Sequence, residues 1–393
     1  MAPQPAVYKA STVFFKNVAA MRARDWKTKQ GYTYGLHGTP TTFILEERIA
    51  SLDDGAHCIL VPSGLAAIAL VGMSLLQSGD EVLIPDNAYG PNKALAEGEF
   101  ARWGIGHQFY DAMNPADLEA RITPRTRLVW LEAPGSVTME FGPIAHFAHI
   151  CRQKGVLTAL DNTWAGGIAF SGFDFGSGER QVKNSGADIV VHALTKYPSG
   201  GGDVLMGSVV TRDEALHTRL KMTHMRMGAG VGANDVEAVL RALPTLAVRY
   251  AAQDAASRQI AQWLQRRPEV TQLLHPAFAG SPGHEHWQAL CGGNGESGTK
   301  AGGHAAGLFS IVLDPRYSSA QVDRFCDALK LFKLGYSWGG PVSLVVPYDI
   351  GSMRDPQRWK RKGALVRFSI GFEEVDDLLA DLDQALATLD NLD

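Results

Sequence analysis

The chain has 393 residues, of which 45% are hydrophobic and 20% charged, and its formal net charge is −4. This length and composition are expected of two globular domains that share a cleft. The slight negative charge gives no electrostatic reason to expect binding to nucleic acid or to an anionic membrane surface.

The first 40 residues are mixed in composition and rich in turn-forming residues, so we expect them to form an extended arm. No basic stretch followed by an apolar block occurs in residues 1–21. A secretory signal is therefore not expected, and a cytoplasmic location is the default. The spacing of apolar residues in 41–52 then predicts a helix.

Short apolar runs alternate with helical stretches over the next part of the chain. Strands are predicted at 57–61, 81–84, 128–131, 156–160 and 188–192, and helices at 65–77 and 143–154. This alternation predicts a largely parallel sheet covered on both faces. The longest nearly apolar run, 65–76, is shorter than the roughly 20 residues that a membrane helix needs. Ligands of such sheets bind beyond the carboxyl ends of the strands, so the polar residues there are the first candidates for a site.

The C-terminal part has a different pattern. A long helical region at 234–266 is followed by a stretch rich in Gly and His, 276–307, which we interpret as a surface insertion. Strands are predicted at 308–313, 342–346 and 364–370, and helices at 319–331 and 374–389. We therefore expect an α/β protein with an arm (1–40), a large domain (41–245) and a smaller C-terminal α+β domain (246–393).

The turn after the first predicted strand reads Pro62-Ser63-Gly64-Leu65 and opens a predicted helix. Backbone N–H groups at a helix N-terminus attract phosphate, so the turn is either a phosphate seat or a plain helix cap. The segment is not GxGxxG, and no GxxxxGK[ST] occurs in the chain, which argues against dinucleotide and P-loop sites.

Tyr89 and Asp161 follow two other predicted strands. The Tyr89 ring either stacks on a flat cofactor ring or is a half-buried loop side chain. The Asp161 carboxylate either pairs with a protonated pyridine nitrogen or caps a helix. Each residue viewed alone leaves both interpretations open.

Lys196 follows the run at 188–192 and precedes three consecutive glycines, 200–202. Partial burial lowers the pKa of a lysine and makes its amine a usable nucleophile. The alternative is a surface lysine in a flexible loop, which the segment alone favours.

Arg367 lies inside an apolar strand pattern. A buried guanidinium needs an anionic partner, and the α-carboxylate of an amino-acid substrate would serve. The alternative is an arginine on the solvent face of the strand.

No metal site is expected. The four cysteines form no CxxC pair, and the histidines near residues 275–304 match no standard ligand spacing. The residues considered and set aside are His275, His284, His286, His304 and Cys291.

Together these segments resemble the trans-sulfuration (Cys/Met metabolism) family of pyridoxal-5′-phosphate (PLP) enzymes, which have the aspartate-aminotransferase fold (fold type I). The resemblance runs from about Tyr34 to Glu373. It is carried, in order, by Tyr34-Gly35, Gly38-Thr39-Pro40-Thr41, Ser63-Gly64, Asp86-Asn87-Ala88-Tyr89, Glu132-Ala133-Pro134-Gly135-Ser136, Asp161-Asn162-Thr163, Thr195-Lys196-Tyr197 and Arg367. Within the family, the chain is most similar to the cystathionine β-lyase branch, on Asp161-Asn162-Thr163-Trp164-Ala165, Tyr336-Ser337-Trp338-Gly339-Gly340 and residues 132–140.

The resemblance implies a role for each matching residue. Lys196 would carry PLP as a Schiff base and shuttle protons, assisted by Tyr89, which would also stack on the ring. Asp161 would pair with the pyridine nitrogen. The implied cofactor-binding residues are Tyr34, Gly64, Leu65, Tyr89, Asp161, Thr163, Thr195 and Lys196, and the implied substrate-binding residues are Tyr336, Ser337, Trp338 and Arg367. Tyr34 would reach the phosphate of a neighbouring subunit, which implies a homodimer at least and typically a tetramer.

The implied reaction is β-elimination of L-cystathionine, a thioether amino acid, to homocysteine, pyruvate and ammonia, as in methionine biosynthesis. Other members of the family are the alternatives: a γ-lyase, a γ-synthase or a cystine lyase. An aminotransferase of the same fold type and a non-catalytic protein that has kept the fold are further alternatives.

The chain departs from the family pattern at three places. Leu36 stands where an arginine usually follows Tyr34 at two residues' distance. Gly201-Gly202 replaces the usual His-Ser before Asp203, and Val342 replaces a glutamate usually found shortly after the Gly339-Gly340 pair.

Overall fold

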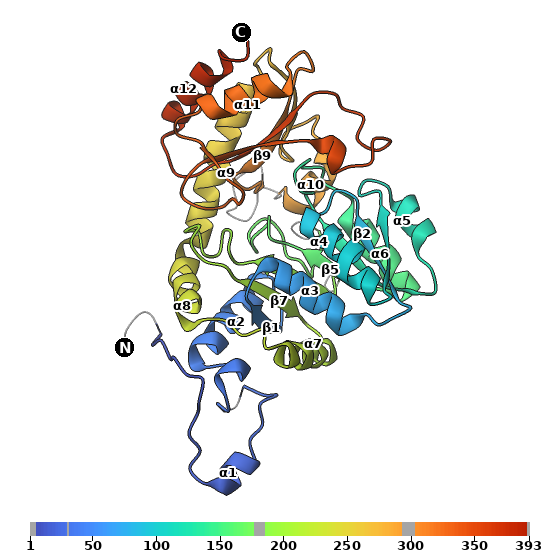
Figure 1. Ribbon diagram of the computed structural model, residues 1–393, viewed down its shortest axis with the longest axis vertical. Coiled ribbons are helices and arrows are strands. Elements are labelled where there is room, and N and C mark those ends of the chain that lie inside the picture. Colours follow the sequence, from blue (N-terminus) through green and yellow to red (C-terminus); the bar gives the residue numbers. More distant parts are fainter. Residues whose placement is uncertain (1–4, 30, 177–184, 293–302, 391–393) are drawn as a thin grey trace.

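The computed structural model describes residues 5–29, 31–176, 185–292 and 303–390. A seven-stranded and a five-stranded sheet organise this part of the chain. In Figure 1 the arm, with α1 (Val18–Arg22), extends below the larger sheet, and the smaller sheet lies near the top. None of the described helices combines the length and apolarity required to cross a bilayer.

The large sheet is mostly parallel, as the sequence predicts. Its strands, in sheet order, are β1 (His57–Val61), β7 (Gly207–Thr211), β6 (Ile189–Ala193), β5 (Leu157–Asp161), β4 (Thr126–Glu132), β2 (Glu81–Pro85) and β3 (Gly106–Tyr110). Among these strands, β7 pairs antiparallel with β1 and β6, and all the other pairs are parallel. The sequence analysis missed β7 and the edge strand β3. β3 is only partly buried and mixes polar with apolar residues, so its apolar pattern is weak.

Side chains of β4 show why the strands of this sheet read as continuous apolar runs. Val129 and Leu131 belong to the core cluster that contains Phe147 of α6, whereas Leu128 and Trp130 belong to the cluster that contains Ile68 of α3. Successive residues of a strand face opposite sides, so both faces of this sheet are buried.

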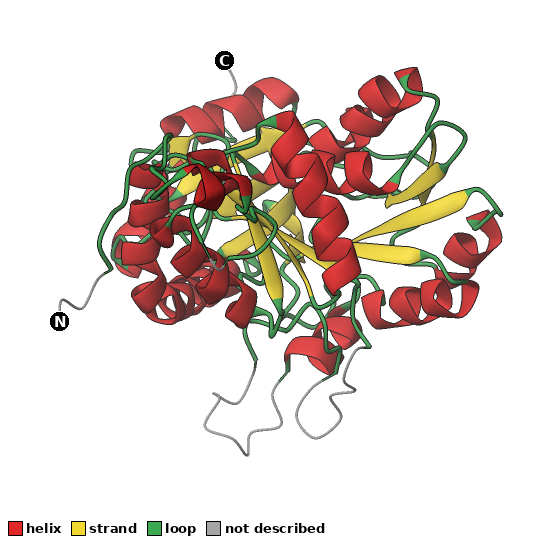
Figure 2. Ribbon diagram, turned by 90° about the horizontal axis from the view of Figure 1, so that it is seen from below, coloured by secondary structure: helices red, strands yellow, loops and turns green. Residues whose placement is uncertain are grey.

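Helices cover both faces of the large sheet (Figure 2). They are α2 (Pro40–Leu52), α3 (Gly64–Leu75), α4 (Gly90–Leu95), α5 (Pro115–Arg121), α6 (Ile144–Lys154), α7 (Glu214–Met227) and α8 (Ala233–Ala242). Local signals set their ends: Thr39 and Ser63 accept backbone hydrogen bonds as the N-caps of α2 and α3, and Gly155 ends α6 with a φ of +67°.

The small sheet consists of β10 (Lys333–Leu334), β11 (Leu344–Tyr348), β12 (Leu365–Ser369), β9 (Leu308–Leu313) and β8 (Val270–Leu274). α9 (Leu246–Leu264), α11 (Ser319–Ala328) and α12 (Val375–Leu386) bury apolar side chains in one core cluster with Val366 and Phe368 of β12. Arg367, between them on the strand, therefore faces away from these helices.

The region 234–266 is helical, as predicted, but a 3₁₀ turn, Leu243–Thr245, separates α8 from α9, because Pro244 has no N–H for a continuous helix. One detail of the C-terminal prediction was wrong. The supposed loop-like insertion at 276–307 contains α10 (His284–Cys291), whose Trp287 is buried, while residues 293–302 lie outside the described part of the chain.

Candidate active site

A cavity of about 600 Å³ lies where the carboxyl ends of the large-sheet strands meet the small sheet. Its lining includes residues that directly follow β1, β2, β4, β5 and β6, and residues of the segment 336–353 and of β12. Chain segments far apart in sequence therefore meet at one space. This is the edge of the sheet at which the sequence analysis expected a ligand.

Lys196 projects into this cavity. Its Nζ donates a hydrogen bond to Ser337 Oγ at 2.8 Å and lies 5.4 Å from the centre of the Trp338 ring. Burial, helped by the nearby charge of Arg367 and opposed by Asp161, lowers the pKa of Lys196 to about 8. Lys196 is therefore not a surface lysine in a flexible loop. Because its pKa is lowered, part of its amine is in the neutral, nucleophilic form near neutral pH.

Asp161 ends β5 and faces the same cavity. Its Oδ1 accepts hydrogen bonds from the Thr163 N–H at 3.0 Å and the Thr163 hydroxyl at 2.5 Å. Burial raises the pKa of Asp161, while the Thr163 hydrogen bonds and the charges of His192 and Lys196 oppose that rise. The aspartate does bond to the backbone that follows it, but no α-helix begins there, so it is not a helix cap.

A buried ion pair lies beneath Asp161, and the sequence analysis did not anticipate it. His192 Nε2 pairs with the Asp53 carboxylate, which also accepts a hydrogen bond from Asn162 Nδ2 at 2.9 Å. Burial lowers the pKa of His192, but the Asp53 charge and hydrogen bond outweigh burial, so the net shift is upward. When His192 is protonated, its charge favours an ionised Asp161.

Glu132 is a second carboxyl group on the cavity wall, and the sequence analysis gave it no role. It ends β4 directly beside Asp161 of β5 and accepts hydrogen bonds from the Tyr89 N–H at 2.8 Å and the Ser136 hydroxyl at 2.6 Å. Burial and the Asp161 charge raise the pKa of Glu132 to about 8. Its position at a strand end, within a motif that supports the family resemblance, is the signal that could have identified it.

The N-terminus of α3 forms part of the opposite wall. Gly64, Leu65 and Thr195 line the cavity there. A Cβ atom on residue 64 would lie 2.7 Å from the Ala193 Cβ, so the close approach of α3 to the end of β6 requires glycine. The first N–H groups of this turn therefore remain the candidate anion seat of the segment 62–67.

Arg367 is 8% exposed, which excludes the solvent-facing alternative. Burial lowers the pKa of Arg367. Its guanidinium donates to the Ser337 carbonyl at 3.3 Å and lies over the Tyr348 ring at 5.3 Å, and no carboxylate of the described residues pairs with it. A buried, unpaired cation in a cavity favours an anionic ligand.

Ser337 lies between the two cationic side chains. Its φ of +108° is in a region that non-glycine residues rarely adopt. In this conformation Ser337 accepts from Lys196 through its hydroxyl and from Arg367 through its carbonyl. Tyr336, which is 81% exposed, and Trp338 complete this rim of the cavity.

Tyr34 is the predicted site residue that the structure does not bring to the cavity of its own chain. It precedes the 3₁₀ turn Gly35–His37 on the arm, is 48% exposed, and is absent from the described cavity lining. Tyr89 does line the cavity, and burial together with the Asp161 and Glu132 charges raises its pKa.

Among the described residues, no group of His, Cys, Asp and Glu side chains is arranged to hold a metal ion. A cluster of a lysine, a carboxylate at a strand end and a helix N-terminus fits PLP instead, because these groups match its aldehyde, pyridine nitrogen and phosphate.

Comparison with known proteins agrees with this fit. A family model described as Cys/Met metabolism PLP-dependent enzyme matches residues 1–387. The chain belongs to this family. Its cofactor is therefore PLP, and its substrate is an amino acid.

Individual proteins of known name are similar to this chain over nearly its whole length. The chain is 38% identical to a cystathionine β-lyase of Bordetella avium, over 96% of this chain and 90% of that protein. It is 32% identical to the cystathionine β-lyase MetC of Escherichia coli K12, over 98% and 93% of the two chains. The crystal structure of metB from Corynebacterium glutamicum matches with a TM-score of 0.84 and 27% identity, covering 99% of this chain and 94% of that one.

Proposed function

We propose that this protein is a PLP-dependent cystathionine β-lyase, which releases homocysteine, pyruvate and ammonia from L-cystathionine. The observation that carries the proposal is the joint placement of Lys196 and Arg367 around Ser337 in one cavity. A nucleophilic amine and an unpaired guanidinium that both contact Ser337 suit a reaction at the Cα of a bound amino acid. The β-lyase relatives, at 32–38% identity over nearly the whole chain, support the choice of reaction.

The cofactor-side roles follow from the chemistry of each group. Lys196 would hold PLP covalently, and its free amine would take the proton from the substrate Cα. Asp161, which Thr163 orients, would pair with the pyridine nitrogen and keep it protonated. Bound PLP would supply an electron sink for the charge developed at Cα.

The other cofactor contacts hold PLP in place. The Gly64 and Leu65 N–H groups and the Thr195 hydroxyl hold the phosphate. The Thr195 hydroxyl also bonds to the backbone of Met206, at 3.1 Å from its N–H, which fixes the hydroxyl at the cavity edge. Tyr89 stacks on the ring, and its backbone N–H is already held by Glu132.

Substrate contacts involve the rim formed by the segment 336–338 and β12. Arg367 and the Ser337 hydroxyl hold the α-carboxylate, an anion that supplies the partner missing from the buried guanidinium. Fixing the carboxylate orients the Cα–H bond relative to the ring, which is a positioning effect on the proton transfer. Trp338 and Tyr336 shape the pocket for the rest of the substrate.

We also propose that the active protein is a homodimer or a homotetramer, with the arm reaching a neighbouring subunit. Side chains on the arm are exposed in the single chain: Phe14 is 94% and Val18 is 56% exposed. Exposed apolar residues of this kind suit contact with another chain. Tyr34 would then lie beside the PLP phosphate of the neighbouring subunit. The division into domains at residue 245 and the cytoplasmic location stay predictions.

The decisive experiment incubates the purified holoenzyme with L-cystathionine, L-cystine and L-methionine and identifies each keto acid. We expect pyruvate from cystathionine, without any added keto acid. Dominant 2-oxobutyrate would indicate a γ-lyase, and a requirement for a keto-acid acceptor would indicate an aminotransferase. Exchange of the Cα proton without release of a keto acid would contradict elimination altogether.

A further inference from the structure

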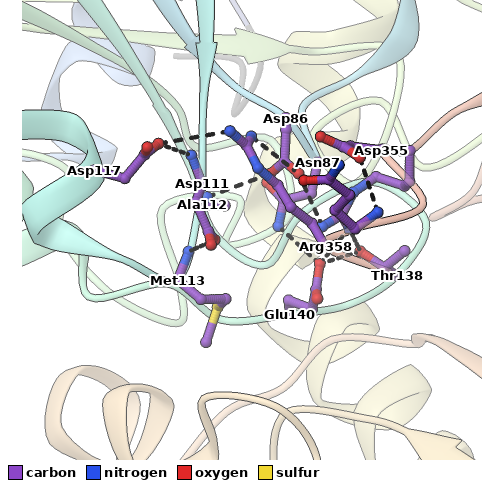
Figure 3. Close-up of polar contacts among 12 residues, drawn as sticks. Asp86, Asn87, Asp111, Ala112, Met113, Asp117, Thr138, Glu140, Asp355 and Arg358 are labelled. Atoms are coloured by element: carbon purple, nitrogen blue, oxygen red, sulfur yellow. Dashed lines mark hydrogen bonds and ion pairs between the residues drawn. The ribbon is translucent and has the colours of Figure 1, made fainter. Parts of the chain in front are cut away.

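A cluster of charged side chains lies outside the site described above, close in sequence to residues of the cavity lining. Figure 3 shows its polar contacts. The segment after β11 contributes two arginines to it. Arg354 pairs with Glu140 and, at 3.1 Å, with Asp86, while Arg358 lies 3.4 Å from the same Asp86 carboxylate and 3.7 Å from Asp117. We call Arg354, Asp86 and Glu140, with Arg358 on its outer side, the wall network.

The wall network joins parts of the chain that are remote in sequence. Arg354 Nη1 also donates to Thr138 Oγ1 at 3.1 Å, and Thr138 in turn donates to Glu140 at 2.8 Å. Lys93 adds a second link, since its Nζ donates both to the Asp86 carbonyl at 3.0 Å and to the Met353 carbonyl at 2.7 Å. The segment 350–358 is therefore fixed to the loops after β2 and β4 of the large sheet.

Each segment held by the network also carries a side chain of the cavity wall. Met353 directly precedes Arg354, Tyr89 follows Asp86 by three residues, and Val137 and Met139 flank Thr138. None of Arg354, Glu140 and Asp86 lines the cavity itself. The network can therefore act on a ligand only through the placement of these wall side chains.

The central charged side chains of the wall network are buried, so each of them needs its partners. The Arg354 side chain is 4% exposed and those of Asp86 and Glu140 are each 6% exposed. Charges this deep are retained only when each has its partners, and the planar guanidinium reaches two carboxylates and a hydroxyl at the same time. A small displacement of Arg354 would break several contacts together, so the network favours one position of Met353.

The chemistry of the held side chains indicates which part of a substrate they contact. Val137, Met139 and Met353 are apolar and cannot replace the hydration of an α-carboxylate or an α-amine. They suit the methylene groups of an unbranched side chain beyond Cβ. We propose that Arg354 is a positioning residue that sets the substrate range of the cavity, favouring long, unbranched aliphatic or thioether side chains over short ones.

This inference rests on the proposed function for the site but is testable without turnover. L-norleucine and L-alanine carry no leaving group at Cβ, so each can be titrated against the holoenzyme by following the visible absorbance of bound PLP. The test variant is R354M/E140Q, which removes one buried cation together with one buried anion and so avoids an uncompensated charge. The matched control is R358M, which removes a cation bound to the same Asp86 but adjacent to no cavity-lining residue.

For R354M/E140Q we expect the preference for norleucine over alanine to fall about tenfold or more, because misplacing an apolar wall costs a ligand its methylene contacts. R358M should keep the preference of the parent protein within about twofold. Hydrogen exchange should show faster exchange of the Met353 and Arg354 amides, both bonded to the Ile350 carbonyl, in the double variant only.

An unchanged preference in the double variant, or an equal loss for both ligands, would overturn the inference and leave Arg354 a purely structural residue. Failure of the proposed function gives a different result, because the keto acid formed by the parent protein would then not be pyruvate while the norleucine preference could still be measured.

Discussion

The ionisation of Lys196 depends on three influences that the cavity brings together. Burial is the largest cause of its lowered pKa, the Arg367 charge acts in the same direction, and Asp161 acts against both. An ordinary lysine is almost wholly protonated at neutral pH. With a pKa of about 8, an appreciable share of Lys196 is in the neutral form that reacts with an aldehyde.

The pH dependence of cofactor attachment follows from this shift. Covalent incorporation of PLP into the apoprotein should speed up about tenfold per pH unit below roughly pH 7.5 and level off above about pH 8.5, because only the neutral amine attacks. In R367L the midpoint should move to higher pH, since one cause of the lowered pKa is removed. Stopped-flow absorbance measures the rate of PLP incorporation and the pH at its midpoint, with N-α-acetyl-lysine as the reference amine. A parent rate still rising between about pH 9 and 10 would mean an unshifted lysine.

Arg367 offers a second test at the scale of one residue. Removing one partner of a buried charge pair costs about 2–5 kcal/mol of binding free energy. Because Arg367 is the proposed partner of the substrate carboxylate, R367L should raise the KM for cystathionine at least about 30-fold. The apoprotein should lose no thermal stability, because its buried guanidinium has no carboxylate partner among the described residues. R102L, at an exposed arginine, is the control for both measurements. A lower melting temperature of R367L apoprotein would indicate a structural role.

At the scale of elements, the cavity depends on how closely α3 approaches the end of β6. The Ser63 hydroxyl accepts the Ala66 N–H, which fixes the first turn of α3, and Gly64 allows that turn to touch Ala193. Backbone geometry also places the side chains of β12. Successive residues of a strand face opposite sides, so Val366 and Phe368 pack against the helices while Arg367 lies in the cavity. Local backbone geometry thus aims each group before any ligand arrives.

Substitution of Gly64 tests the role of the α3 N-terminus. In G64A the added Cβ would meet the Ala193 Cβ at 2.7 Å, so the turn must shift away from the phosphate seat. We expect the dissociation constant for PLP to rise about tenfold, the cost of one weakened charge-assisted hydrogen bond. Equilibrium dialysis of the apoprotein measures it. G98A is the matched control, because nothing lies within 4 Å of the corresponding Cβ. Equal affinity in G64A and the parent would remove the phosphate seat from α3.

At the scale of the whole molecule, the question is which chain completes the site. Tyr34 is a predicted phosphate ligand, yet it is absent from the described cavity lining of its own chain. Figure 1 shows the arm extending below the large sheet, on the side away from the small sheet. A site built by two chains reconciles these observations. Such sharing also explains why the arm keeps apolar side chains exposed in the single chain.

Mixing two inactive variants tests this arrangement. Y34A and K196A should each have little activity alone, but together they should recover about a quarter of the parent activity, because about half of randomly paired two-fold dimers are mixed and one of their two sites is intact. Activity after co-refolding, with sedimentation to verify dimers of the 42.4 kDa chain, is the measurement. Mixed K196A and R367L serve as the control, since both residues belong to one chain's cavity and no intact site can form.

The sequence by itself determined the α/β class, the largely parallel sheet and the family. Apolar runs of strand length, punctuated by polar strand ends, report the two-sided burial of such a sheet directly. The same logic made Lys196, Asp161 and Gly64 candidates for a site, because the carboxyl ends of parallel strands share one edge, whereas their roles were implied by the family resemblance. These features are local in sequence, so a pattern of a few residues carries them.

Only the tertiary structure decided the features that depend on distant partners. Whether Lys196 and Arg367 are buried, and that they meet at Ser337, depends on how the two sheets pack together. The same holds for the raised pKa of Glu132 and for the wall network, whose partners lie more than 200 residues apart. Burial and pairing set the energy of a charge, and both are properties of the packed chain that no short sequence pattern contains.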